Sequence, residues 1–388
     1  MDPRTAARDR IEDSREALID LSHRVHATPE LGFAETVSAA TVADALELAG
    51  FRVERGICDL PTAFVARAGS GPLRIAICAE YDALPAVGHA CGHNVIAAAA
   101  VGAGLGLAAV ADEIGVEVLV VGTPSEEGGG GKVLMLERGG FDGVHAAMMV
   151  HPTYYETGHM PMIAAGHVTV TYRGKPAHAA QAPELGLNAA DALVVAQVAI
   201  GLLRQQLPPS VKAHGIVLKG GDAMNIIPHE TVIDFMFRAP TIGELEPAKR
   251  RIMACFEAGA VATGCEMEVV LAGPDYAEVV SDPDLLAAWE RNARTLGRKL
   301  WPEAGPAPTQ ASTDMGNISL AIPSIHPGLS LDCFPVVNHQ PEFAAACVTP
   351  VADRAVMDGA VGMAWTAIDA ATDPSVRERL LGRAFRAG

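Results

Sequence analysis

The stretch 116–131, VEVLVVGTPSEEGGGG, indicates both the kind of sheet and the place of a functional site. Residues 116–123 are almost continuously apolar, as expected for a strand that is buried on both faces of a parallel sheet. Glu126 and Glu127 follow, and adjacent carboxylates repel each other unless a cation or a shared proton lies between them. The four glycines after them let the backbone approach a site closely. We therefore expect one glutamate to bind a metal ion and the other to act as general base.

Similar apolar runs flank this stretch in the chain. Strands are predicted at 74–80 and 145–152, and the uncharged run 95–111 predicts a buried helix between the first two strands. Apolar residues at helical spacing predict an amphipathic helix over 9–26. Strands that alternate with helices are typical of an α/β fold, in which helices cover a mostly parallel sheet.

Polar side chains with metal or proton chemistry come directly after these strands. Asp82 follows the first strand, and His151 is expected to end the third. In open α/β sheets the working site lies outside the carboxyl ends of the strands. Asp82, His151 and the two glutamates are therefore expected to meet at one edge of the sheet.

The middle of the chain has a different pattern. Between 163 and 275 the order strand, helix, strand, strand, helix, strand is typical of a compact ferredoxin-like (βαββαβ) domain. We expect this domain to be inserted into a larger one that residues 1–162 and 276–388 form together.

The bulk composition excludes several classes of function. The chain has 29 Lys and Arg residues against 46 Asp and Glu, a formal net charge of −17, so a nucleic-acid partner is not expected. The charged N-terminus lacks the apolar core of a signal peptide, and the seven cysteines are not spaced as in a disulfide framework. The run 95–111 is short for a membrane span. We expect a cytoplasmic protein without a membrane partner.

The hexamer HACGHN at 89–94 provides a second candidate site. Cys91 and His93 are suitable zinc ligands, and a helix N-terminus directly after them favours the thiolate; a buried free cysteine beside a structural histidine is the alternative. His151 and His326 each precede a proline after an apolar run, and either could be structural. Together with Glu127, these residues suffice for two metal ions if the thiolate bridges them.

These motifs, in this order, resemble metallopeptidase family twenty. The similarity runs from HATPELGF through AEYDALP, GHACGHN, GTPSEEGGGGK, MVHP, GKPAHAA and NIIP to STDMGN and IHPG. It is strongest for the branch with a cysteine in place of a bridging aspartate, and within it for the p-aminobenzoyl-glutamate hydrolase and β-alanyl-dipeptidase-like members. Asn94 differs from the aspartate that many members of this branch have there, and His89 resembles a family residue that we do not assign to a metal.

The resemblance implies a role for each matching residue. The implied metal ligands are Cys91, His93, Glu127, His151 and His326. Glu126 would be the general base and Asp82 the carboxylate that orients a ligand histidine. In the inserted domain, which would serve as lid and dimerisation surface, His178 would polarise the scissile carbonyl, and Asn225 and Arg238 would contact the substrate.

The sequence therefore predicts a metal-dependent hydrolase that cleaves the amide bond of N-acyl amino acids or dipeptides. Its cofactors would be two divalent ions, zinc or manganese, with cobalt and nickel as further candidates, and it would act as a homodimer through the lid. Two alternatives use the same scaffold. They are a hydrolytic deaminase of an aromatic amine and a metal- or ligand-binding protein without activity.

Overall fold

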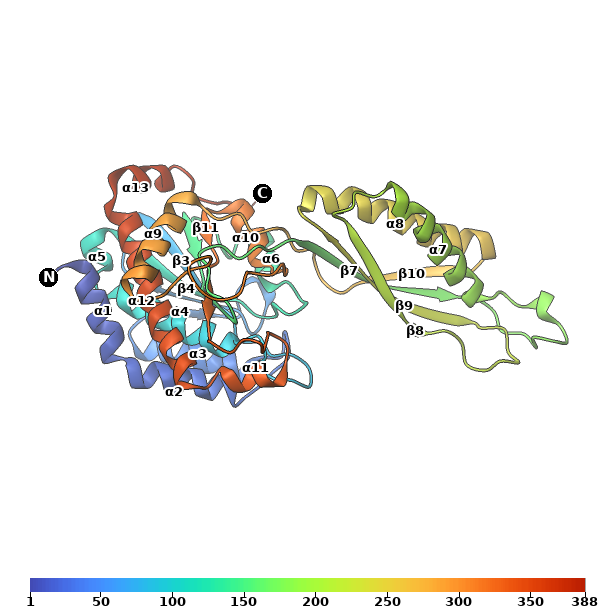
Figure 1. Cartoon of the computed structure of the whole chain (residues 1–388), viewed down its shortest axis with the longest axis horizontal. Coiled ribbons are helices and arrows are strands. Elements are labelled where there is room, and N and C mark those ends of the chain that lie inside the picture. The colour runs from blue at the N-terminus through green and yellow to red at the C-terminus, as the bar shows by residue number, and fades with distance from the viewer. Residues whose placement is uncertain (388) are drawn as a thin grey trace. The chain divides into compact units, whose positions relative to one another are not determined.

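A computed structural model describes residues 1–387, which fold into two compact units. Unit 1 combines Met1–Met162 with the chain from Val279 onward, and unit 2 is the continuous segment Ile163–Glu278 (Figure 1). No helix within these residues combines the length and the apolar character that crossing a bilayer requires.

The central sheet of unit 1 has six strands in the order β1-β2-β4-β3-β5-β11. Strands β4, β3, β5 and β11 are parallel to one another, whereas β2 is antiparallel to β4 and β1 is antiparallel to β2. The expected α/β fold with a mostly parallel sheet is confirmed. The strands are β1 (Arg52–Arg55), β2 (Phe64–Ala68), β3 (Leu73–Ala79), β4 (Val116–Gly122), β5 (Ala146–Met148) and β11 (Ser324–Ile325).

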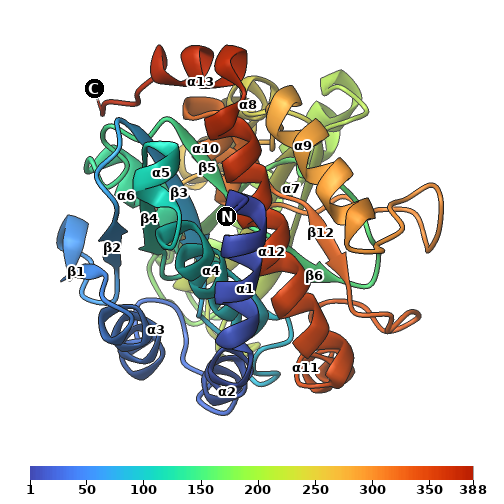
Figure 2. The same cartoon turned by 90° about the vertical axis from the view of Figure 1, so that its left-hand side faces the viewer.

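The buried helix expected at 95–111 is α4, which spans His93–Ala108 and whose residues are almost all inaccessible. It packs against α12 (Pro350–Thr372), and Figure 2 shows α1 (Pro3–Asp13) beside these two helices. A Cβ atom on Gly102 would lie 2.7 Å from the Cβ atom of Ala360, so the small residues of α4 allow this close helix packing.

The helix expected at 9–26 is interrupted. Residues 3–13 form α1, and α2 (Arg15–His26) begins anew after Ser14, whose hydroxyl donates to the Arg10 carbonyl. The remaining helices of unit 1 are α3 (Thr36–Leu48), η1 (Ile57–Asp59), α5 (Ala111–Ile114), α6 (Gly131–Glu137), α9 (Pro283–Thr295), α10 (Met315–Ala321), α11 (Pro341–Ala346) and α13 (Pro374–Leu381).

The strand predicted at 145–152 is two strands, and His151 does not end the third strand of the central sheet. That strand, β5, ends at Met148, and His151 begins β6 (His151–Thr153). Strand β6 pairs with β12 (Gly328–Ser330) in a separate two-stranded sheet. The His151 N–H donates to the Pro327 carbonyl, so beyond β5 the chain follows the 325–330 segment instead of the central sheet.

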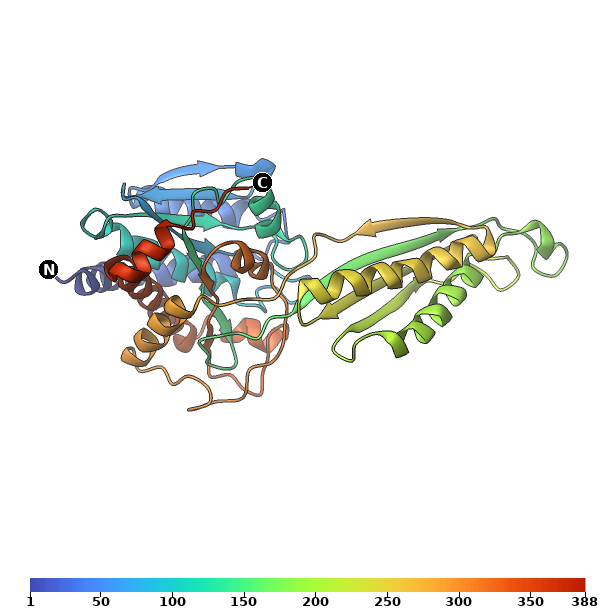
Figure 3. The same ribbon diagram turned by 90° about the horizontal axis from the view of Figure 1, so that it is seen from above.

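Unit 2 has the expected βαββαβ order. Its four strands form an antiparallel sheet in the order β10-β7-β9-β8. Burial alternates along β7 and β9, and the buried side chains pack under α7 and α8 (Figures 1 and 3). The elements are β7 (Ala164–Arg173), η2 (Pro183–Leu185), α7 (Ala189–Leu203), η3 (Arg204–Gln206), β8 (Lys212–Lys219), β9 (Glu230–Ala239), α8 (Ile242–Thr263) and β10 (Glu266–Leu271).

Candidate metal centre

Metal-ligating side chains gather at the carboxyl ends of β3 and β4. Glu80 and Asp82 follow β3, whereas Glu126 and Glu127 follow β4. His93 is the first residue of α4, whose N-terminus lies at the same edge. The sheet edge predicted from the strand pattern is therefore where these groups meet.

The first group of donor atoms comes from Cys91, His93 and His151, which all lie within 4.8 Å of one another. The Cys91 Sγ atom is 3.6 Å from His151 Nε2, and His151 Nδ1 lies 2.8 Å from the Pro152 carbonyl oxygen. That carbonyl requires a proton on Nδ1, which leaves Nε2 with a lone pair facing the sulfur. Burial lowers the pKa of His151 to about 4, so the imidazole is neutral and able to bind a metal.

Asp82 links His93 to the glutamate loop. Its Oδ1 atom is 3.0 Å from His93 Nδ1, and its Oδ2 atom accepts the Glu127 N–H at 3.0 Å. Burial alone would raise the pKa of Asp82, but His93 beside it holds that pKa below its usual value. The bond to Asp82 turns the Nε2 atom of His93 toward the glutamates.

A second donor group joins Cys91 and Glu127 to His339, a residue that the sequence analysis missed. His339 Nε2 lies 3.6 Å from Glu127 Oε1, and the side chain is 57% exposed. Its backbone has a φ of 71° and its N–H donates to the Ala90 carbonyl, which anchors the loop beside Cys91. The only signal in the sequence was a histidine before Gln-Pro in NHQPEF.

His326, which the sequence predicted as a ligand, contributes to none of the three-atom donor groups found among residues 1–387. Its ring is fully buried, and its centroid lies 5.6 Å from that of His151. Burial and His151 lower the pKa of His326 well below its usual value, so the ring is neutral. The donor groups of the described residues therefore include His339 and do not include His326.

Glu126 has the environment of a proton acceptor, and with Glu80 and His93 it forms a third group of donor atoms within 4.8 Å of one another. The residue is 5% exposed, and its Oε2 atom lies 3.9 Å from His93 Nε2. Burial, followed by the charges of Glu80 and Glu127, raises the pKa of Glu126 well above its usual value. A carboxylate with a raised pKa holds a proton more readily, as a general base must.

The Glu35 carboxylate holds the loop that carries the glutamates through hydrogen bonds. The Glu35 carboxylate accepts the Ser125 N–H at 2.8 Å and the Thr62 hydroxyl at 3.0 Å. Ser125 has a φ of 57°, and a Cβ atom on Gly129 would lie 2.1 Å from its hydroxyl oxygen. The glycine run is therefore needed for the loop to fold tightly around Ser125.

A buried cluster of Glu80, Lys132 and Asp314 lies beside the donor groups and was also missed. Lys132 Nζ pairs with Glu80 Oε1 and, at 2.7 Å, with Asp314 Oδ1, and all three side chains are inaccessible. Burial raises the pKa of Asp314 to about 6 despite Lys132. Each residue lies inside a quoted motif, and Glu80 directly after a buried strand was the signal that could have found it.

Several buried acceptor atoms of this region lack a hydrogen bond within residues 1–387. They are Glu80 Oε2, His93 Nε2 and Glu127 Oε1. Burial and the charges of Glu127 and Glu126 raise the pKa of the Cys91 thiol well above its usual value, so a thiolate there requires a cation. Divalent cations would satisfy these atoms, and the thiolate, imidazole and carboxylate donors fit them.

The residues expected to contact substrate from unit 2 do not all lie together. The Ala179 N–H, next to His178, donates to the Asn225 carbonyl, and the His178 Nδ1 atom accepts the N–H groups of Ala180 and Gln181. Arg238 lies eight residues from Glu230 along β9, at the end opposite to these loops, a distance of about 26 Å.

Asn94 and His89 lie outside the donor groups. The Asn94 amide donates to the Ser22 hydroxyl and to the Cys347 carbonyl, so it fixes α4 to its neighbours. His89 is buried without a hydrogen bond to either ring nitrogen, and burial lowers its pKa to about 4.

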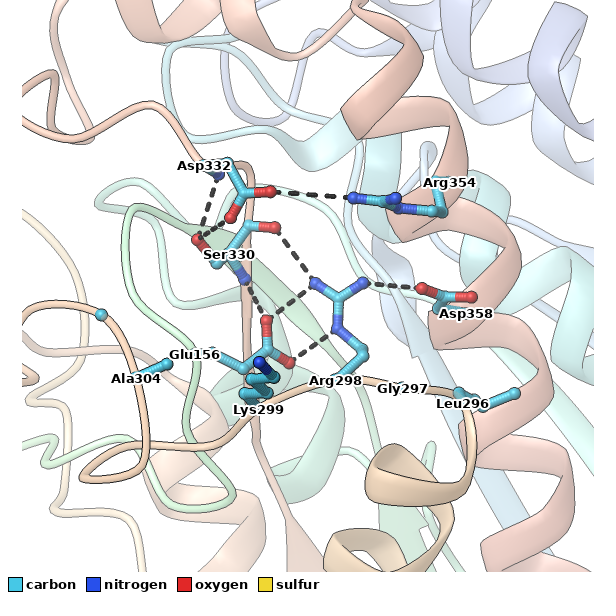
Figure 4. Close-up of a pocket in the computed structure, with 11 residues that line it drawn as sticks. Glu156, Leu296, Gly297, Arg298, Lys299, Ala304, Ser330, Asp332, Arg354 and Asp358 are labelled. Carbon is cyan, nitrogen blue, oxygen red and sulfur yellow. Dashed lines mark hydrogen bonds and ion pairs between the residues drawn. The ribbon is translucent and has the colours of Figure 1, made fainter.

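A second charged cluster in unit 1 lines a cavity of about 350 Å³ (Figure 4). Arg298 donates to both oxygens of Glu156 at 2.7 and 2.8 Å and to Asp358 at 2.8 Å. The Ser330 N–H donates to Glu156 as well. Arg298 is paired with Glu156 and Asp358, and none of the three belongs to a metal-donor group found within residues 1–387.

Comparison with known proteins identifies relatives of this chain. Residues 76–347 match the sequence profile of peptidase family M20/M25/M40. The chain is 37% identical to the Xaa-Arg dipeptidase of Mus musculus, over 96% of this chain and 90% of that protein. It is 31% identical to one of the subunits of the p-aminobenzoyl-glutamate hydrolase of Escherichia coli K12, over 67% of this chain and 58% of that protein.

Solved structures share the fold. An aminobenzoyl-glutamate utilization protein from Klebsiella pneumoniae superimposes with a TM-score of 0.73 at 18% identity, covering 93% of this chain and 97% of that one. A dinuclear metal-binding peptidase from Bacillus subtilis superimposes with a TM-score of 0.65 at 21% identity, covering 90% of this chain and 98% of that one.

Proposed function

The chain belongs to peptidase family M20/M25/M40 and is a hydrolytic enzyme, and we propose that it cleaves the amide bond of a dipeptide or N-acyl amino acid with Glu126 as general base. The observation that carries this proposal is the position of Glu126. Its buried carboxylate has a raised pKa and lies 3.9 Å from the site-facing nitrogen of His93.

Cys91, His93, Glu127, His151 and His339 would hold two divalent cations, with the Cys91 thiolate shared between them. Zinc suits the thiolate and imidazole donors, and manganese, cobalt and nickel are the other candidates. When bound, such ions polarise a carbonyl oxygen and lower the pKa of a water molecule. The sharing of Cys91 by both of its donor groups supports this assignment.

Glu126 would accept a proton from the attacking water while the water oxygen bonds to the carbonyl carbon. As the carbon–nitrogen bond breaks, Glu126 would pass the same proton to the leaving amine. Asp82 would keep His93 in the tautomer that faces the site. Each of these steps uses a residue of the cluster at the sheet edge.

The favoured substrate is a dipeptide with arginine or lysine at its C-terminal position. The similarity to the Xaa-Arg dipeptidase extends over nearly the whole of both chains, whereas the similarity to the p-aminobenzoyl-glutamate hydrolase covers two thirds of this one. An acidic net charge of −17 also favours the approach of a cationic substrate.

Unit 2 would act as the lid of a homodimer. One dipeptide spans about 7 Å, so His178 with Asn225 and the distant Arg238 of the same chain do not reach one substrate together. The lid groups of one protomer would therefore act with Arg238 of its partner. Exposed apolar side chains on the edge strand β8, Ile216 to Leu218, support pairing through unit 2. Seven free cysteines suit a reducing cytoplasm.

The test is a substrate panel on protein loaded with zinc or manganese and on metal-free protein. It contains Xaa-Arg and Xaa-Lys dipeptides, β-alanyl dipeptides, N-acetyl amino acids and p-aminobenzoyl-glutamate. Metal-dependent release of an amino acid is expected, most rapidly from the Xaa-Arg dipeptides. Ammonia without an amino-acid product would indicate a deaminase, and metal binding without any product would indicate a binding protein.

A further inference from the structure

Only one oxygen of the Glu80 carboxylate makes a hydrogen bond with the described residues around it. Its Oε1 atom pairs with Lys132, whereas its Oε2 atom makes no hydrogen bond within residues 1–387. The Oε2 atom lies 3.3 Å from His93 Nε2, which also lacks a hydrogen bond. Both side chains are completely inaccessible, so no bulk water satisfies either atom.

His93 Nε2 and Glu80 Oε2 face each other at 3.3 Å. His93 Nδ1 is 3.0 Å from Asp82, which is an acceptor, so Nδ1 carries a proton. The facing atoms are satisfied either by a second ring proton on Nε2 or by a cation, and a divalent ion bound to His93 would replace that proton.

The distances favour Glu80 over the other glutamates as a partner of His93 on one ion. With metal–nitrogen and metal–oxygen bonds of about 2.1 Å, the 3.3 Å separation from Glu80 subtends about 105° at the metal. The separations of 3.8 and 3.9 Å from Glu127 and Glu126 require about 130–135°. Cys91 and His151, 3.6 Å apart, form a donor group with His93, and Glu80 forms a separate one with His93 and Glu126.

We propose that Glu80 is a metal ligand that binds an ion together with His93, in the site whose function is proposed above. Glu80 and His93 form a donor group with Glu126, and His93 also belongs to the group of Cys91 and His151. The group of Cys91, Glu127 and His339 contains neither Glu80 nor His93.

Lys132 and Asp314 are the positioning residues for Glu80. Lys132 Nζ pairs with Glu80 Oε1 and with Asp314, whose other oxygen accepts the Lys132 backbone N–H at 2.9 Å. These bonds fix the Glu80 rotamer with its Oε2 atom toward His93. The ammonium also offsets one of the two carboxylate charges of Glu80 and Asp314.

The test compares Glu80→Gln with Glu156→Gln as the matched control. Each substitution removes one charge from a buried ion pair of unit 1, but Glu156 contributes to none of the donor groups found in residues 1–387. Zinc content per chain, chelator competition and the absorption spectrum of the cobalt-loaded protein are measured. We expect Glu80→Gln to lower the affinity for one of the two bound ions by about 10–100-fold. Glu156→Gln should leave the affinity for both ions unchanged.

A second variant, Glu80→Leu with Lys132→Met and Asp314→Asn, guards against misfolding of Glu80→Gln. It removes all three charges of the cluster, and uncharged residues often replace buried ion pairs without loss of stability. The same loss of one ion is expected. Two ions bound with wild-type affinity in both Glu80 variants overturn the assignment, even if the wild type is active. A zinc-loaded wild type that cleaves no amide overturns the proposed function instead, and the zinc comparison still decides the role of Glu80.

Discussion

Unit 1 contains two buried ion-pair clusters that differ in one respect. Around Arg298, both oxygens of Glu156 accept hydrogen bonds and the guanidinium is shared with Asp358 (Figure 4). Around Lys132, one oxygen of Glu80 pairs with the ammonium, and the other makes no hydrogen bond within residues 1–387 and lies 3.3 Å from His93 Nε2. Buried polar groups in proteins are nearly always satisfied, so an unsatisfied one needs an explanation. The Arg298 cluster joins elements of the fold, whereas the Lys132 cluster presents a free acceptor to the donor groups.

The largest difference between the two clusters is expected in catalysis. Glu126→Gln next to the Lys132 cluster should lower kcat by about 10²–10⁴-fold, because it removes the proton acceptor. Its metal content should stay at the wild-type value. Steady-state kinetics on an Xaa-Arg dipeptide, together with zinc analysis, check both statements. Turnover equal to the wild type would show that Glu126 is not the base.

On the Arg298 side the expected effect is on stability. Glu156→Gln leaves the Arg298 guanidinium with a weakened partner in a largely buried position. We expect a loss of about 3–5 kcal/mol in the free energy of unfolding, the range for breaking a buried ion pair. Denaturant unfolding measures the loss, and kcat per folded molecule should not change. An unaltered unfolding curve would contradict the structural role given to this cluster.

His89, beside the metal centre, makes the stability of the folded protein depend on pH. Its pKa is about 4 in the folded protein and about 6.5 in the unfolded chain, so below pH 6.5 the unfolded chain alone gains this proton. The stability that neutral His89 contributes is therefore full above pH 6.5 and is lost as the pH falls to about 4. In metal-free protein, His89→Gln should reduce the loss between pH 7 and pH 4.5 by about 2–3 kcal/mol. Equal pH dependence in both proteins would refute this.

The smallest expected effect separates two histidines. His339→Ala should lower the affinity for one bound ion by about 10–100-fold, because it removes a donor from the group of Cys91, Glu127 and His339. His326→Gln should leave the affinity for both ions near the wild-type value, since that ring belongs to none of the donor groups of residues 1–387. Chelator competition on the two variants decides which histidine is the ligand. The opposite result would restore His326 to the ligand set.

The sequence predicted what depends on local pattern. The apolar run before Glu126 identified β4, and the alternation of strands and helices identified the fold of both units. Asp82, Cys91 and His93 come directly after strand β3 or at the start of α4, so chain order alone placed them at one edge.

The remaining contacts depend on tertiary structure and were not readable from the sequence. Lys132 meets Glu80 across 52 residues of chain and Asp314 across 182, and no periodicity reports such contacts. His326 and His339 are both close to prolines, and only the backbone of the 339 loop brings one of them beside Cys91. The break between β5 and β6 likewise follows from the hydrogen bond to Pro327, a residue far along the chain.

Anomalous diffraction at the zinc edge from crystals of the zinc-loaded protein is the most direct examination of how these donors are shared. Two peaks per chain are expected. One should have His93 and the Glu80 carboxylate among its ligands, and the other should have Cys91, Glu127 and His339. A single peak, or a pair without the Glu80 carboxylate within bonding distance, would contradict the division of the donors between two unlike ions.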